Sequence, residues 1–162
     1  MEAVFRAIGV VHVDAPDEVI KSSFDGVDGV VEIFPEFEDG LTGIDGFSHI
    51  ILITYLHKHR GNPLRVKPKR LIKFGVPEEV IPEVGVFVTD SPDRPNPIGL
   101  SIVKLLGREG RFLKVSGLDL FNGTPVLDIK PYTPDRVVED IKLPKWYTDL
   151  SNVLSRLGIH IV

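Results

Sequence analysis

The chain has 162 residues, of which 43% are apolar, with a formal net charge of −4 and no cysteine. This length accommodates one ordinary domain, and the lack of cysteine excludes disulfides, thiolate metal sites and cysteine nucleophiles. Because there is no run of about 18 apolar residues and no signal-peptide pattern, we expect a cytoplasmic protein without a membrane span. We also expect a single domain over residues 1–162.

The charges are unevenly distributed along the chain. Residues 58–73, here called the basic segment, carry a charge of +7 and no acid, so the rest of the chain sums to −11. Residues 14–45 contain ten acids and a single lysine. The basic segment is therefore either a candidate anion-binding face or a solvated loop that faces the acidic part of its own chain. Its cations are Lys58, Arg60, Arg65, Lys67, Lys69, Arg70 and Lys73.

In the first part of the chain, two runs rich in Val and Ile predict strands. They cover residues 4–13 and residues 29–34, and the second run ends at Pro35. The polar stretch between them, residues 14–28, carries turn residues and is predicted as a loop. Residues 36–41 follow and can form one helical turn.

The most apolar stretch, residues 50–56, is short and β-branched, which predicts a buried strand. Near the end of the chain, apolar residues recur at helical spacing over residues 145–157, and Gly158 follows as a stop. Several short strands followed by one helix indicate a barrel or a sandwich rather than alternating β and α units. The remaining strands are predicted over residues 85–89, 98–106, 112–116, 118–120 and 126–129, with turns at residues 107–110 and 122–125.

Residues 90–97 form a polar loop that leads into one of these strands and contains three prolines. The prolines fix the backbone, so the loop is rigid. Arg94 offers a planar fork for a carboxylate, a phosphate or a base, and Asn96 offers both a donor and an acceptor. The loop is therefore either a recognition site or a stiff surface turn with an exposed arginine.

A second polar segment covers residues 119–132 around the predicted turn. Its Asn122-Gly123 pair allows positive φ, so backbone groups can turn towards a ligand. Further along, Asp128 and Lys130 alternate with apolar residues and so share one strand face. There they either serve a site or pair with each other in solvent.

Together, the two polar segments resemble the signature of the TrmO (YaeB-like) family. The resemblance covers residues 8–134, and residues 135–162 form a C-terminal extension with the predicted helix. The long matches are residues 85–89, Ser91, residues 94–101, residues 119–120 and residues 123–132, and shorter ones lie at residues 8–11, residues 46–49 and His57.

The resemblance implies a small β-barrel of about seven short strands that binds S-adenosylmethionine without a Rossmann fold and forms a homodimer. The implied activity is methylation of the exocyclic amine of a threonylcarbamoyl-modified adenosine beside the anticodon of tRNA. Methyl transfer from a sulfonium is an in-line displacement that needs no metal, and its rate comes mainly from alignment of the reacting atoms. His57 and His59 have no evident third ligand, so no metal is expected.

The implied site residues form three groups. The acceptor side includes Asn96, and either Asp128 or the Asn96 backbone carbonyl is expected to accept a hydrogen bond from the adenine amine. The phosphates of tRNA are expected to contact Arg60, Arg65, Lys67, Lys69 and Arg70 of the basic segment. The cofactor pocket is expected to include His57, Lys58, Arg94, Leu100, Phe121, Asn122, Gly123 and Thr124.

Two departures from the family pattern leave alternatives open. Members usually carry Thr-Arg-Ser where this chain has Asp90 at the centre, which replaces a cation expected to touch the cofactor by a carboxylate. The Pro-Arg-Gln-like segment of the first long loop has no residue-by-residue match in residues 15–22. These departures favour a methyltransferase with another acceptor or a binding barrel without catalysis. The intact residues 94–97 and 122–125 favour the tRNA methyltransferase.

Overall fold

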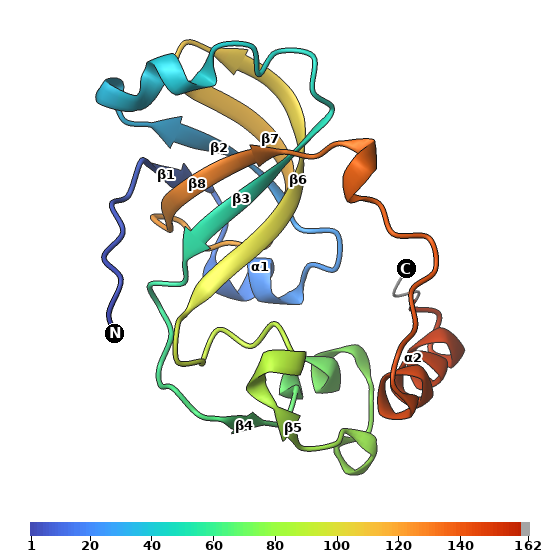
Figure 1. Cartoon of the computed structure of the whole chain (residues 1–162). Helices are drawn as coiled ribbons and strands as arrows, with labels where there is room; N and C mark the ends of the chain where they lie inside the picture. Colours follow the sequence, from blue (N-terminus) through green and yellow to red (C-terminus); the bar gives the residue numbers. More distant parts are fainter. Residues whose placement is uncertain (160–162) are drawn as a thin grey trace.

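The computed structural model describes residues 1–159 and contains a closed six-stranded barrel with a smaller unit at one end (Figure 1). The strand order around the barrel is β1-β2-β7-β6-β3-β8, with antiparallel pairing throughout. This architecture confirms the predicted mainly β fold with a C-terminal helix, although the barrel has six strands instead of about seven. The barrel strands are β1 (Gly9–His12), β2 (Val27–Ile33), β3 (His49–Tyr55), β6 (Ile98–Glu109), β7 (Phe112–Leu118) and β8 (Pro125–Pro131).

Alternation of side chains along each strand fills the barrel interior. In β3, Ile50 and Leu52 are fully buried, and they pack with Val11 of β1, Val31 of β2 and Val126 of β8. β-Branched and leucine side chains suit this interior because they pack well on a pleated surface. The barrel core is therefore aliphatic, and polar chemistry is left to the outer face and the two ends.

The smaller unit is built by the insertion between β3 and β6, residues 56–97, together with the C-terminal helix α2 (Lys145–Arg156). The observed bounds of α2 confirm the helix predicted over residues 145–157. Figure 1 shows α2 beside the insertion and away from the barrel. The insertion contains β4 (Arg65–Val66), β5 (Val84–Gly85) and the 3-10 helices η2 (Lys69–Phe74), η3 (Glu78–Val80) and η4 (Val86–Val88).

Two predicted strands are shorter than expected. The first covers Gly9–His12 instead of residues 4–13, because its neighbour β2 ends where Pro35, which lacks an N–H, begins the 3-10 helix η1 (Pro35–Leu41). The strand predicted over residues 85–89 is only the end of β5. It turns into η4, in which the Thr89 N–H donates to the Val86 carbonyl at 3.2 Å.

Two connections also differ from the prediction. The loop predicted over residues 14–28 contains a short helix, α1 (Asp17–Ser22), whose Ile20 is buried in the barrel core. The hairpin turn predicted at residues 107–110 lies later, because β6 continues to Glu109 and Gly110 adopts a φ of 59°. A last 3-10 helix, η5 (Pro134–Arg136), precedes the linker to α2.

Within residues 1–159, no helix is both long and apolar enough to cross a membrane. Residues 160–162, the end of the predicted C-terminal extension, lie outside the described residues.

Candidate functional site

The antiparallel topology brings four separate segments to one end of the barrel. β3 runs antiparallel to both β6 and β8, so its exit, with His57 and Lys58, lies beside the entries of β6 and β8. The rigid loop with Arg94 precedes β6, and the turn of residues 121–124 precedes β8. β1 is also antiparallel to β8, so α1, which follows β1, lies at this end as well.

The turn before β8 is held by hydrogen bonds within itself and to β1, and it borders open space. The Val13 N–H donates to Asn122 Oδ1 at 3.0 Å, and the Thr124 N–H and Oγ1 donate to the Phe121 carbonyl at 3.1 and 2.7 Å. Gly123 has a φ of 82°, a left-handed conformation that favours glycine. A Cβ added at Gly123 would meet no atom within 4 Å. The turn is therefore fixed both by its own bonds and by its bonds to residues 11–13, and it leaves room beside Gly123.

Lys58 meets the turn at the ring of Phe121. Its ammonium lies 5.1 Å from the ring centroid, a cation–π distance, and contacts both carboxylate oxygens of Asp17 at 3.0 and 2.7 Å. Lys21 lies 5.5 Å from the same centroid. Because Asp17 and Lys21 belong to α1, the region that departs from the family pattern reaches the predicted cofactor turn.

Neither Asp17 nor Lys21 was identified by sequence reasoning. A signal was available, because a proline followed by two acids at residues 16–18 is typical of a helix N-terminus. That signal predicts a helix but not its place. Only the closure of the barrel brings α1 to Phe121.

Arg94 is directed at the backbone of its own loop. The half-buried guanidinium donates to the Thr89 carbonyl at 2.9 Å and to the Ser91 carbonyl at 3.5 Å. Asp90 and Asn96 are exposed on this loop. The backbone carbonyl of Asn96 already accepts the Ile98 N–H at 2.7 Å. Arg94 thus stiffens the loop, and the Asn96 side chain is available to a ligand.

His57 is half-buried at the exit of β3. Burial lowers the pKa of His57, and the neighbouring Lys58 lowers it further, although Asp17 opposes the shift. Within the described residues, the buried Nδ1 atoms of His57 and His59 have no hydrogen-bond partner. Residues 1–159 contain no group of three potential metal ligands. The surroundings of His57 therefore favour its neutral imidazole, and its Nδ1 is a buried polar atom without a partner.

Leu100 and Asp128 lie on the outer face of the barrel, at either side of Ile53 of β3. The side chain of Leu100 is 65% exposed. Asp128 forms an ion pair with Lys130 at 2.7 Å, and both side chains are about half exposed. The alternation of side chains along the strand therefore predicted correctly that Asp128 and Lys130 share one face. Leu100 and Asp128 are thus two strand spacings apart, about 10 Å, with Ile53 between them.

Most cations of the basic segment have partners within the chain. The side chain of Arg60 has no acid within ion-pair distance among residues 1–159. The pairs are Lys58 with Asp17, Arg65 with Glu83, Lys67 and Lys69 with Glu78, and Lys73 with Glu18, and Arg70 donates to the Ser23 carbonyl. The segment thus faces acids of its own chain, and it stays basic overall because its cations outnumber these acids.

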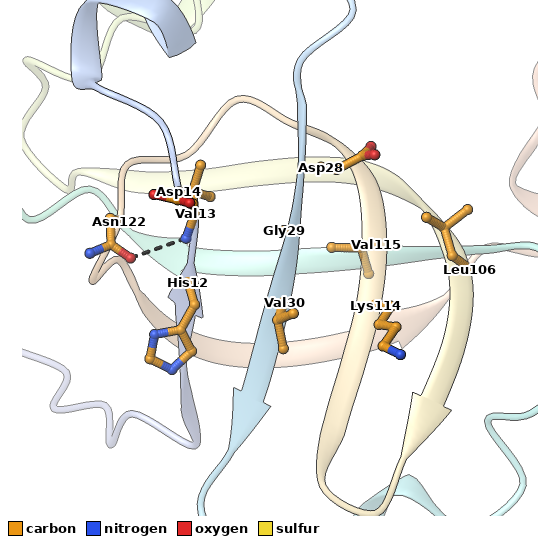
Figure 2. A pocket seen from close by; sticks show the side chains of 10 residues that line it. All are labelled: His12, Val13, Asp14, Asp28, Gly29, Val30, Leu106, Lys114, Val115 and Asn122. Carbon is orange, nitrogen blue, oxygen red and sulfur yellow. Dashed lines mark hydrogen bonds between the residues drawn. The ribbon is translucent and has the colours of Figure 1, made fainter.

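A hollow of about 570 Å³ lies on the flank of the barrel and touches the turn only at Asn122 (Figure 2). Its apolar lining includes Val30 and Val115, and Asp14 and Asp28 bring carboxylates to it. In Figure 2 the Asn122 oxygen faces the Val13 N–H and the amide nitrogen points away from it. Phe121, Lys58 and Arg94 do not line this hollow. This hollow and the motif-bearing end are therefore different places, and we place the candidate site at the end.

The fold and the site together define a class of protein, a small ligand-binding β-barrel. The stiff loop and the glycine turn at one end of the barrel form the candidate site, and the cations beside them form a potential anion-binding face. The family model of the tRNA-methyltransferase O N-terminal domain matches residues 13–136. The chain belongs to this family, TrmO, as the sequence motifs predicted.

Individual relatives agree with this membership. A probable S-adenosyl-L-methionine-binding protein of Pyrococcus abyssi is 42% identical over 137 residues, which cover 81% of this chain and 68% of that protein. A tRNA (adenine(37)-N6)-methyltransferase of Rattus norvegicus is 43% identical over 105 residues, 64% of this chain and 22% of that protein. A crystal structure of TrmO is 32% identical with a TM-score of 0.68, covering 88% of this chain and 64% of that chain. The chain thus spans only part of each of these proteins.

Proposed function

We propose that this protein is a cytoplasmic S-adenosylmethionine-dependent methyltransferase that acts on the exocyclic amine of an adenosine in tRNA. The observation that carries this proposal is that the loop of one family motif, residues 94–97, and the turn of the other, residues 121–124, lie at one end of the barrel beside the exit of β3. The names of the relatives support the cofactor and the reaction. Following the family resemblance, the acceptor is a threonylcarbamoyl-modified adenosine beside the anticodon.

The residues at this end fit the parts of S-adenosylmethionine. Phe121 offers a ring for the adenine, and the amide of Asn122 offers N–H donors for hydroxyl groups. Lys58 and Lys21 offer cations for the carboxylate, which would share Lys58 with Asp17 and Lys21 with Glu18. The bound cofactor supplies a methyl group on a sulfonium. The chain's residues align that group with the acceptor.

Asp128 and Asn96 are the proposed groups that orient the acceptor amine. Asp128 Oδ1 accepts the Ile129 N–H at 2.9 Å and Oδ2 contacts Lys130, so the carboxylate retains lone pairs for a further donor. Asn96 is exposed and contributes its side-chain amide. A carboxylate that accepts the amine hydrogen bond favours the nitrogen lone pair for attack.

The basic segment is the proposed tRNA contact, through Arg60, Arg65, Lys67, Lys69 and Arg70. Exposed ion pairs contribute little free energy, so a phosphate can replace a protein carboxylate at low cost. Because Glu78 and Glu83 compete for the same cations, binding should be modest and should weaken steeply with salt.

The outer face of β6 is the proposed homodimer contact. Ile98, Leu100 and Ile102 are 41%, 65% and 47% exposed and form one apolar stripe. A second copy on this stripe would stand against Leu100 and Asp128, and so beside the acceptor side. Leu100→Asp should yield monomers in analytical ultracentrifugation without loss of thermal stability. A wild-type monomer, or an unchanged dimer of the variant, would exclude this interface.

A second candidate function is a binding barrel without catalysis. Asp90, in place of the family's arginine, and the existing Lys58–Asp17 pair favour it, because both reduce the positive charge available to a cofactor carboxylate.

Calorimetric titration with S-adenosylmethionine in low salt separates these functions. We expect micromolar binding, weakened about 5- to 150-fold by Phe121→Ala because ring stacking contributes about 1–3 kcal/mol. Phe112→Ala is the matched control, since Phe112 also carries a cation over its ring, at 4.6 Å, but lies at the other end of the barrel. Lack of binding at millimolar cofactor would remove the enzyme proposal. Binding without methyl transfer to tRNA would support the binding barrel.

A further inference from the structure

Helix α2 lies outside the part of the chain that the family model matches. The match ends at residue 136, and α2 covers Lys145–Arg156. Neither the motifs nor the proposed chemistry assigns a role to this helix. Its packing, however, is specific.

The apolar face of α2 forms a second hydrophobic core with the insertion. Leu150 and Leu154, four residues apart and so on one helix face, are 7% and 0% exposed. They pack with Val76 and Ile81 of the insertion, which are 1% and 2% exposed, and with a partly buried rim that includes Trp146. None of these residues belongs to the barrel core.

The insertion has little secondary structure with which to hold itself. Its sheet has two strands of two residues each, and its helices η2, η3 and η4 are 3-10 turns of three to six residues. Such elements are marginal without tertiary packing. α2 supplies two of the four buried side chains of the second core, as many as the insertion itself supplies.

The second core lies directly among the cations of the basic segment. Leu71, which packs against it, stands in η2 between Lys69 and Lys73. Glu78, which pairs with Lys67 and Lys69, begins η3 and precedes the buried Ile81. The core therefore fixes the backbone from which these cations project.

We propose that α2 is a brace that orders the insertion, and that Leu150 and Leu154 are positioning residues for tRNA binding. The proposal rests on the proposed function of the basic segment. A preordered set of cations binds phosphates without an ordering cost at the moment of association. Loss of the brace therefore lowers the affinity for tRNA. The cofactor site keeps its affinity, because its residues in the insertion, His57, Lys58 and Arg94, lie near the ends of β3 and β6 and take no part in the second core.

The test uses the full chain with Leu154→Ala and three comparison variants. Leu154→Met conserves volume and should rescue; Asn152→Ala changes an exposed residue of the same helix; and Leu113→Ala makes the same truncation in the barrel core. The measurements are the affinity for a tRNA transcript with adenosine beside its anticodon, the affinity for S-adenosylmethionine, and amide hydrogen exchange.

For Leu154→Ala, we expect about tenfold or more weaker tRNA binding and cofactor binding within about twofold of wild type. Amides of residues 64–88 should exchange faster, while those of the barrel stay protected. Leu113→Ala should instead speed exchange in the barrel. Equal tRNA affinity of Leu154→Ala and wild type, or unchanged exchange in the insertion, would overturn the brace. Wild-type protein that binds no tRNA would overturn the proposed function itself, which is a separate outcome.

Discussion

The turn before β8 permits a quantitative prediction about Gly123. Its φ of 82° is strained for any other residue, and a Cβ there would meet no atom within 4 Å. In Gly123→Ala the strain costs about 1–2 kcal/mol, and the reduced freedom of the unfolded chain offsets about 0.4–1 kcal/mol of it. We therefore expect a net loss of roughly 0.5–1.5 kcal/mol, or a drop in Tm of about 2–5 °C for a chain of this size.

Two further variants make this estimate refutable. Gly123→Asn should lose less stability than Gly123→Ala, because asparagine tolerates the left-handed region. Gly99→Ala should lose more, about 1–3 kcal/mol, because its Cβ would lie 2.6 Å from Thr54 Oγ1 and 2.8 Å from Leu56 Cδ2 in a packed region. Differential scanning calorimetry measures all three. If Gly123→Ala were at least as damaging as Gly99→Ala, backbone strain in open space would be the wrong account of the turn.

Three other predictions concern individual site residues. The folded protein lowers the pKa of His57 and so binds fewer protons than the unfolded chain. Its free energy of unfolding should therefore fall as the pH drops below the unfolded pKa of about 6.5. Urea unfolding at pH 7.5 and 5.5 should show a smaller difference in this free energy for His57→Gln than for wild type. Arg94→Met should speed amide exchange of residues 89–97, since it removes the hydrogen bonds that Arg94 Nη1 donates to the Thr89 and Ser91 carbonyls, and unchanged exchange would refute that bracing role. Asp128→Asn should slow methyl transfer to tRNA while changing stability by less than about 1 kcal/mol, because its ion pair is exposed; unchanged turnover would remove Asp128 from the acceptor side.

The predicted strands and helix were most accurate where one local pattern dominates. Residues 50–56 lie within one residue of the observed β3, because a short, β-branched apolar run has few alternatives to a buried strand. The C-terminal helix was predicted to within one residue from its apolar spacing. The prediction was wrong where the length of a strand depends on its neighbour. Residues 4–8 have the composition of a strand, but β2 ends before it can pair with most of them.

The candidate site also has features that local sequence predicted and contacts that it did not. The stiff loop around Arg94 and the turn around Gly123 were predicted from the sequence alone, because proline and glycine restrict or permit backbone angles whatever surrounds them. The sequence likewise determined the family, through motifs that are long and contiguous. Only the tertiary structure decided which groups meet: Lys58 with Asp17, 41 residues apart, and Lys73 with Glu18, 55 residues apart. The tertiary structure also decided that the Arg94 guanidinium binds carbonyls of its own loop and that α2 packs against the insertion. These contacts depend on the pairing order of the barrel strands and on packing between distant segments, which no local pattern of residues encodes.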